Sequence, residues 1–544
     1  MTRSDFITPF GPHAPAVTGD EPAMGIKGAN LVTMSGLGIP VPPGFVVHTS
    51  MGARHTAEDS VLASELQQAT RQEIAALDSD LDWHFADPER PLLISVRSGA
   101  AVSMPGMMDT VLNLGLSDAV MPAFARQTGN PRFAWDTYRR FIQSYSQVVL
   151  GLDADEFEMV LEELRARENC GSDSELSVEV LQEAVSIFHQ IVNELSGAPF
   201  PQEPFDQLDG ALLAVFRSWN TPRAIRYRDM HDMSHEGGTA AIVQTMVFGN
   251  RDENSCTGVY FTRNPSTGEK KPYGEFMVNA QGEEVVSGIR TPQELTEEAR
   301  IHAMSTTASM ERLLPDAFAQ LLATGDKLER HFQDMQDIEF TVESGTLYLL
   351  QTRSAKRTPK ATVRIAVDMA NENIISRAEA VGRCNTETLA PMLVSKVDPN
   401  AGAPVFTKGL PASPGAVSGE IIFDSDAAVA AADEGRSVIL VRPETDPKDV
   451  HGMNAAKGVL TTRGGMTSHA AVVARGMNKP CITAAMTLKI DANAGTCASL
   501  GTELRQGDTI TIDGGSGNVY VGVQPVVTPE PDGELATLLS WRDT

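Results

Sequence analysis

The spacing of apolar residues changes twice along the chain, from strand-like to helical and back, and this pattern limits the folds that the chain can adopt. Residues 20–115 mix short β-like runs, such as Phe45–Val47 and Leu92–Val96, with glycine and proline turns. Residues 117–205 show the helical spacing of apolar side chains instead. Strand patterns return at 241–248, 258–261, 337–342 and 346–350. We therefore expect an α/β body into which a helical subdomain is inserted.

Length and charge narrow the class of protein further. A chain of 544 residues is too long for one hydrophobic core, so we expect several domains. Its 44 Lys plus Arg against 71 Asp plus Glu give a formal charge of -27, which disfavours nucleic acid and anionic membranes as partners. No apolar run could span a bilayer and no secretion signal is evident, so we expect a cytoplasmic protein. The five cysteines are scattered, which indicates neither a disulfide framework nor a zinc site.

A glycine pair followed by a histidine is the most informative motif. Gly464 and Gly465 allow a tight loop, and Thr467 or Ser468 can cap the helix that begins near His469. The free N–H groups at the start of a helix favour an anion. The pattern suits a histidine that carries a phosphate. The alternative is an ordinary capped helix with an incidental imidazole.

Two cationic residues lie in glycine-rich surroundings in the first part of the chain. Lys27 stands between Gly25 and Gly28, and Arg97 ends an apolar strand-like run. A guanidinium that emerges from such a strand usually has an anionic partner. The loop 98–109 supplies backbone that could fold over phosphates. A solvated lysine and a structural ion pair are the alternatives.

Two strand patterns carry a second polar set. Alternation puts Asp337 and Glu339 on one face of the first strand, and Gln351 and Arg353 on one face of the second. If the strands pair, two carboxylates stand beside an amide and a guanidinium. Carboxylates meet nucleotide phosphates through Mg²⁺, which prefers oxygen ligands. The alternative is a surface charge ladder across a hairpin.

These motifs together resemble the pyruvate, phosphate dikinase family. The similar stretches run in one order through nearly the whole chain, at 27–30, 95–116, 244–250, 261–269, 279–283, 334–340, 351–353 and 464–477. Several long motifs in the same order make the resemblance specific. It implies an ATP-grasp nucleotide-binding region followed by a swivelling β/β/α phosphohistidine domain.

The resemblance also implies domain boundaries. We expect the ATP-grasp region at 1–354, with its helical insertion at 117–205, and a connecting arm at 355–403. The phosphohistidine domain is expected at 404–525 and a C-terminal tail at 526–544. The arm and the segment 409–415 are the expected hinges.

Residue roles follow from the resemblance in the same way. Lys27 and Arg97 would hold ATP phosphates, and the loop 98–106 would close over them. Asp337 and Glu339 would hold Mg²⁺ and nucleotide. On the partner strand, Gln351 and Arg353 would complete the nucleotide site.

The implied reaction is a phosphorylation of His469. In this family the histidine attacks ATP to give AMP and a pyrophosphorylated imidazole, and orthophosphate then removes the terminal phosphoryl group as pyrophosphate. His469 is left as phosphohistidine. In plant members a regulatory kinase phosphorylates the threonine two residues before the histidine, which is Thr467 here.

The resemblance stops before one part of the family pattern. Family members continue into a C-terminal barrel that binds pyruvate or phosphoenolpyruvate, and no stretch of this sequence matches it. We therefore expect that a separate chain serves the pyruvate step. Two other hypotheses are a phosphotransferase for another small acceptor, resembling rifampicin phosphotransferases, and a phosphocarrier or regulatory module. A pure carrier would not need Lys27, Arg97 and the two carboxylates.

Overall fold

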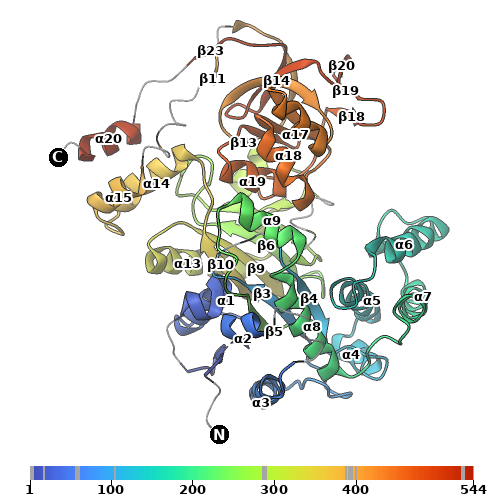
Figure 1. Ribbon diagram of the computed structural model, residues 1–544. Helices are drawn as coiled ribbons and strands as arrows, with labels where there is room; N and C mark the ends of the chain where they lie inside the picture. The colour runs from blue at the N-terminus through green and yellow to red at the C-terminus, as the bar shows by residue number, and fades with distance from the viewer. Residues whose placement is uncertain are drawn as a thin grey trace. The chain divides into compact units, whose positions relative to one another are not determined.

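Two compact units make up the chain, and the computed structural model describes most of both (Figure 1). The described residues are 5–15, 19–55, 62–102, 104, 106–282, 284, 291–385, 389, 396–398, 401–527 and 533–542. Unit 1 comprises Met1–Asp252 with Tyr348–Thr352, and unit 2 comprises Glu253–Leu347 with Arg353–Thr544. Both units combine helices with sheets, so the prediction of a mixed α/β multidomain protein is confirmed.

Unit 1 is built on a five-stranded antiparallel sheet. The strand order is β1 (Ile7–Phe10), β2 (Gly44–Val47), β5 (Ala240–Thr245), β3 (Ile94–Gly99) and β4 (Thr110–Leu114). Every residue of β2 and β5 is buried, because helices pack on this sheet. These helices are α1 (Glu21–Gly36), α2 (Thr49–Arg54) and α8 (Pro204–Ser218). The predicted strands at 45–47, 92–96 and 241–248 correspond to β2, β3 and β5.

The stretch with helical spacing forms a set of packed helices in the same unit. They are α4 (Met121–Thr128), α5 (Pro131–Val148), α6 (Ala154–Glu168) and α7 (Val178–Ser196). The Asn130 side chain caps α5 by accepting from the N–H of Phe133 at 3.1 Å, and Phe133, Tyr138 and Phe141 bury its apolar face. Unit 1 also contains α3 (Ser64–Asp80), η1 (Asp173–Glu175) and α9 (Pro222–Met230).

A second five-stranded sheet is built mostly from residues of unit 2. The order is β10 (Thr346–Ser354), β9 (Gln336–Glu343), β6 (Cys256–Phe261), β7 (Tyr273–Val278) and β8 (Gln293–Glu294). The antiparallel register of β6 and β9 sets Val259 opposite Glu339 and Phe261 opposite Asp337. The helices α11 (Glu297–His302), α12 (Met310–Leu313) and α13 (Pro315–Phe332) precede β9. The two strands predicted to carry the polar set are therefore neighbours.

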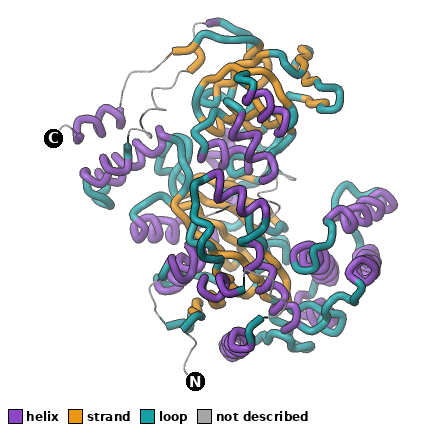
Figure 2. The backbone as a smooth tube through the Cα atoms, viewed as in Figure 1, coloured by secondary structure: helices purple, strands orange, loops and turns teal. Residues whose placement is uncertain are grey.

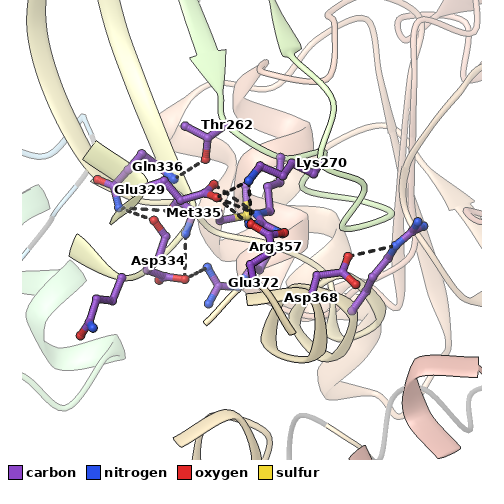
Figure 3. Close-up of polar contacts among 12 residues, drawn as sticks. Thr262, Lys270, Glu329, Asp334, Met335, Gln336, Arg357, Asp368 and Glu372 are labelled. Carbon is purple, nitrogen blue, oxygen red and sulfur yellow. Dashed lines mark hydrogen bonds and ion pairs between the residues drawn. The ribbon is translucent and has the colours of Figure 1, made fainter. Parts of the chain in front are cut away.

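Ion pairs anchor the beginning of the predicted arm to this sheet (Figure 3). The buried Arg263 guanidinium contacts Glu329 of α13 at 2.6 Å and Glu372 at 3.0 Å, and Lys270 contacts Glu372 at 2.6 Å. Glu372 directly follows α14 (Pro359–Asn371). Arg357 pairs with Asp334 at 2.8 Å. The helix α14 is thus fixed to the segments that flank β6 and β9 of this sheet.

An apolar cluster continues this anchored segment. The helices α14, α15 (Arg377–Arg383) and α20 (Gly533–Arg542) pack together. Leu535 and Leu538 of α20 join buried side chains of α14, and Arg377 lies over the Trp541 ring. Residues 386–388, 390–395 and 399–400 of the predicted arm, and 528–532 and 543–544 of the predicted tail, lie outside the described residues. The predicted domain boundaries stay predictions.

The second large sheet of unit 2 has eight strands, drawn in orange in Figure 2. Their order is β12 (Val405–Lys408), β22 (Asn518–Val521), β21 (Thr509–Asp513), β14 (Ala416–Ile422), β15 (Val438–Arg442), β16 (Gly458–Thr461), β17 (Cys481–Thr483) and β13 (Leu410–Ser413). The strands β14 to β17 are parallel neighbours. The carboxyl ends of parallel strands meet at one edge, so the loops after β15 and β16 lie together.

Helices cover the parallel part of this sheet. They are α17 (Ser425–Asp433), α18 (Val450–Ala455), which follows the short η4 (Pro447–Asp449), and α19 (His469–Gly476). Ala470, Ala471 and Ala474 of α19 are buried against β17. Small side chains let this helix approach the sheet closely.

Smaller elements complete the described structure. The strands β11 (Lys396–Val397) and β23 (Val526–Val527) pair antiparallel, and β18 (Lys489–Asp491), β19 (Thr496–Ser499) and β20 (Thr502–Arg505) form a separate small sheet. All five cysteines are free thiols, which agrees with the sequence prediction. Within the described ranges, every helix is too short or too polar to cross a membrane.

Candidate functional site

The glycine loop before α19 forms a tight turn that only glycine permits. Gly464 has a φ of +92°, and a Cβ at this position would lie 2.8 Å from Cβ of Ser468. Ser468 occupies the N-cap position, but its side chain makes no capping hydrogen bond. The prediction that Thr467 or Ser468 takes the N-cap position is confirmed for Ser468, although no side-chain hydrogen bond accompanies it. Ser468 Oγ is buried and lacks a hydrogen-bond partner among the described residues.

The hydroxyl of Thr467 is directed to another element of unit 2. It donates to Glu275 Oε2 of β7 at 2.7 Å, and the Met466 N–H donates to Oε1 of the same carboxylate at 3.3 Å. A Cβ on Gly465 would collide with this carboxylate. Gly465 is therefore needed for the close approach of Glu275. The Thr467 hydroxyl is already engaged in a hydrogen bond to this carboxylate.

Burial shifts the pKa of two carboxyl groups at and near this contact. Burial raises the pKa of Glu275, while Thr467, Met466 and Arg475 oppose the rise. Burial, followed by the Glu275 charge, raises the pKa of Glu294 to about 7. The buried Arg475 donates to the Ala412 carbonyl at 3.1 Å and to the Met466 carbonyl at 2.6 Å. The arginine therefore fixes the loop backbone.

His469 is held from the opposite side by the loop after β15. Its Nδ1 lies 3.0 Å from Thr445 Oγ1. Burial lowers the pKa of His469, and the charges of Asp446 and Asp449 raise it by less. A lowered pKa keeps the half-buried ring neutral near pH 7, which is the nucleophilic form.

The predicted cationic residues of unit 1 lie on adjoining segments. Within α1, Gly25 takes a left-handed conformation with φ +67°, and Lys27 follows it. A Cβ on Gly25 would collide with the Gly99 carbonyl, and the Ile26 N–H donates to the Ala100 carbonyl at 3.0 Å. The helix that carries Lys27 is thus bound to the end of β3, which carries Arg97. Ser103 and Pro105 of the predicted phosphate loop lie outside the described residues.

Arg97 and Gln351 belong to the same unit. The Arg97 guanidinium donates to the Leu350 carbonyl at 3.2 Å and to Gln244 Oε1 at 3.4 Å. Gln351 is buried, and its Oε1 has no hydrogen-bond partner within the described part of the chain. A buried amide oxygen without a partner leaves a hydrogen bond for a ligand to complete.

The predicted carboxylates and Arg353 belong to unit 2. Asp337 is 5% exposed, and its Oδ2 accepts from Arg353 Nε at 2.8 Å. Burial raises the pKa of Asp337, and Arg353 opposes the rise. Glu339 stands two residues along β9, on the same face as Asp337. An exposed charge ladder does not fit the burial of Asp337.

Asp337 offers an unpaired carboxylate oxygen that a magnesium ion could bind. Asp337 Oδ1 is buried and has no hydrogen-bond partner in the described structure, so one hard oxygen is left for a cation. No group of three or more His, Cys, Asp and Glu that could hold a metal occurs among the described residues. Two carboxylates suit Mg²⁺, which usually keeps water and substrate phosphates as further ligands.

Family models match both large parts of the chain. The model described as "Pyruvate phosphate dikinase, AMP/ATP-binding domain" matches residues 51–311 and 296–374, more than half of the chain. The chain belongs to the pyruvate, phosphate dikinase family. A second model, "PEP-utilising enzyme, mobile domain", matches residues 435–517, which include Thr445 and His469.

Similar curated proteins carry the same family name. The "Pyruvate, phosphate dikinase" of Rhizobium meliloti (strain 1021) is 52% identical over 524 residues, which is 96% of this chain and 58% of that protein. The protein of the same name from Clostridium symbiosum is 46% identical over 523 residues, with the same coverage. "Pyruvate, phosphate dikinase 1, chloroplastic" of Arabidopsis thaliana is 44% identical, and 53% of it is covered. This dikinase-family chain thus spans little more than half the length of these relatives.

Sequence reasoning missed three residues of this dikinase-family site. Thr445 could have been found from strand order, because it follows a strand predicted next to the histidine helix. Arg475 lies inside the stretch 464–477, but the sequence pattern alone is typical of an exposed helical cation. Glu275 has no local signal, because its contact with Thr467 joins residues 192 positions apart.

Proposed function

We propose that this chain phosphorylates its own His469 from ATP. ATP and orthophosphate give AMP, pyrophosphate and phospho-His469, and the phosphoryl group then passes to pyruvate to form phosphoenolpyruvate. The observation that carries the proposal is the position of His469 directly after a glycine loop, with its Nδ1 3.0 Å from Thr445 Oγ1 and its pKa lowered by burial. The neutral ring has one nitrogen left for attack.

The finer assignments are part of the same proposal. The region before the arm is an ATP-grasp fold, and the eight-stranded sheet with its helices is a swivelling β/β/α phosphohistidine domain. Lys27 and Arg97 bind ATP phosphates, which their charge and the backbone contact between their segments support. Gln351 and Arg353 complete the nucleotide site.

Asp337 and Glu339 would hold Mg²⁺, which supplies positive charge to the phosphates when it is bound. Arg353 keeps the second oxygen of Asp337 occupied, so that Oδ1 faces the ligand. Lys27 and Arg97 offset the negative charge of the ATP phosphates, which the attacking imidazole must approach. Burial lowers the pKa of His469 and so favours the neutral ring, in which one of the two nitrogens carries a lone pair.

The chemical step exchanges one bond for another. A lone pair of the imidazole forms a bond to the β-phosphorus, and the bond from that phosphorus to the oxygen of AMP breaks. AMP leaves with the electron pair. Orthophosphate oxygen then attacks the γ-phosphorus, which releases pyrophosphate and leaves one phosphoryl group on His469.

A single-turnover measurement tests the nucleotide residues. With Mg²⁺, ATP and orthophosphate, we expect one equivalent of AMP and of pyrophosphate per chain. Asp337→Asn should slow AMP formation at least about tenfold, because a carboxylate charge is lost. The exposed Asp326 provides the control, and Asp326→Asn should keep the normal rate. Equal rates in the Asp337 and Asp326 variants would refute the assignment.

The second step of the proposed reaction is the transfer of the phosphoryl group from His469 to pyruvate, and none of the other residues assigned above serves it. Pyruvate is proposed because relatives at 44 to 52% identity bear the name pyruvate, phosphate dikinase. The expectation that a separate chain serves this step stays a prediction. We expect the reaction to take place in the cytoplasm, where ATP and orthophosphate are supplied. Phosphoenolpyruvate formation by the purified chain would count against the need for a partner.

A further inference from the structure

The contact between Thr445 and His469 joins two loops that the parallel strands bring to one edge. Thr445 lies between β15 and η4 and is 7% exposed. Its Oγ1 lies 3.0 Å from Nδ1 of His469, which begins α19. The pair is contained within one sheet and its helices, so the contact depends only on the local fold.

The carboxylates next to Thr445 accept hydrogen bonds from groups other than the imidazole. Asp446 accepts from the Lys448 N–H at 2.6 Å. Asp449 accepts from the Ser425 hydroxyl at 2.6 Å and from the Asp446 N–H at 3.1 Å, and these bonds form a capping box. The group in contact with the ring is therefore a hydroxyl.

A hydroxyl and a carboxylate have different effects on a nucleophilic histidine. A carboxylate at Nδ1 stabilises the protonated ring, which has no free lone pair. A hydroxyl carries no charge and can accept a hydrogen bond from a neutral ring. The loop between β15 and α18 thus presents the side chain that orients the imidazole without favouring its protonation.

We propose that Thr445 is a positioning residue that fixes the tautomer and the orientation of His469. In the reacting form the Nδ1–H donates to Thr445 Oγ1, and the Nε2 lone pair points away from the threonine. The proposal rests on the proposed phosphorylation of His469. When the bond from Nε2 to phosphorus forms and AMP departs with its electron pair, the proton stays on Nδ1 and keeps its bond to Thr445.

The hydrogen bond between Thr445 and His469 also fixes the orientation of the imidazole after the phosphoryl group has been transferred to it. With Nδ1 tied to Thr445, rotation of the imidazole about its Cβ–Cγ bond would break a hydrogen bond worth about 1 kcal/mol. The ring therefore presents Nε2 along one direction before and after it carries phosphate. Thr445→Val removes this restraint while it keeps the shape of the side chain.

The test combines a tautomer measurement with a rate. The full-length chain is labelled with ¹⁵N-histidine, and the ring signals of His469 are identified by their loss in His469→Asn. We expect the Nδ1–H tautomer in the wild type, and a shift toward the Nε2–H tautomer in Thr445→Val. The rate of ATP-dependent labelling of Thr445→Val should fall about tenfold, whereas Thr445→Ser should restore both the tautomer and the rate.

A neighbouring threonine supplies the matched control. Thr462 bonds the Pro443 carbonyl at 3.3 Å from the loop after β16, and Thr462→Val should change neither the tautomer nor the rate. The proposal is overturned if wild-type His469 is in the Nε2–H form, or if Thr445→Val leaves its tautomer unchanged. If the wild type takes no label from ATP, the proposed function fails, and the tautomer comparison still decides the role of Thr445.

Discussion

At the scale of single residues, the contact of Thr467 with Glu275 decides what a negative charge at position 467 would do. The hydroxyl lies 2.7 Å from a buried carboxylate, so a second carboxylate or a phosphate would meet a like charge. Thr467→Asp should therefore reduce self-phosphorylation at least about tenfold, measured by acid-labile label from ATP. Thr467→Ser keeps the hydroxyl and should be active.

A second substitution separates repulsion from simple loss of the threonine. Adding Glu275→Gln to Thr467→Asp removes one of the two charges and should restore part of the labelling. Full labelling of the single Thr467→Asp variant would refute the idea that modification of Thr467 acts as a switch.

The protonation of His469 gives a pH prediction at the same scale. Its pKa is lowered from 6.5 by burial, so the neutral ring persists below pH 6.5 and the labelling rate should be flat from pH 8 to 7. The rate should then fall with a midpoint below 6.5. The unfolded chain binds this proton at a higher pH than the folded chain does, so the free energy of unfolding also decreases as pH falls through 6.5.

The exposed His451 is a control for this profile, because it pairs with Asp426 outside the glycine loop. His451→Gln should leave the rate profile unchanged. A wild-type midpoint at or above 6.5 would show that burial does not set the pKa of His469.

At the scale of elements, buried charges explain why α14 is a fixed part of unit 2. Arg263 is fully buried and pairs with Glu329 and Glu372. Arg263→Met should lower the free energy of unfolding of this unit by about 3 to 5 kcal/mol, because Glu329 is left buried without its partner. Urea unfolding followed by circular dichroism measures the change.

Lys270 gives the matched control at the exposed end of the same cluster. It is 42% exposed, so Lys270→Ala should cost about 0 to 1 kcal/mol. Equal losses in the two variants would show that burial of Arg263 does not matter for the anchoring of α14.

Several strands and helices could be located from the sequence alone. Alternating and continuous apolar runs located β2, β5, β6, β9 and β10, because each strand is buried on at least one face. Helical spacing located α5 and α6 for the same reason. The anchoring of α14 was not predicted, since Arg263 and Glu372 are 109 residues apart and pair only in the folded chain.

At the scale of the whole molecule, each unit contributes a distinct part of the predicted chemistry. Lys27, Arg97 and Gln351 belong to unit 1, and Asp337, Glu339, Arg353 and His469 belong to unit 2. Their residue types could be predicted because glycine patterns, strand alternation and family motifs are local. Of the two predicted N-cap candidates, Ser468 takes the position, whereas the bond of Thr467 to a distant carboxylate could not be seen in a local pattern.

The central claim is that His469 accepts phosphate from the β-position of ATP. The most direct measurement incubates the full chain with Mg²⁺, orthophosphate and ATP labelled at the β-phosphate, followed by denaturation and peptide mapping. We predict acid-labile label on the peptide that contains His469 in the wild type and none in His469→Asn. An unlabelled wild type, or label that persists in His469→Asn, would contradict the account.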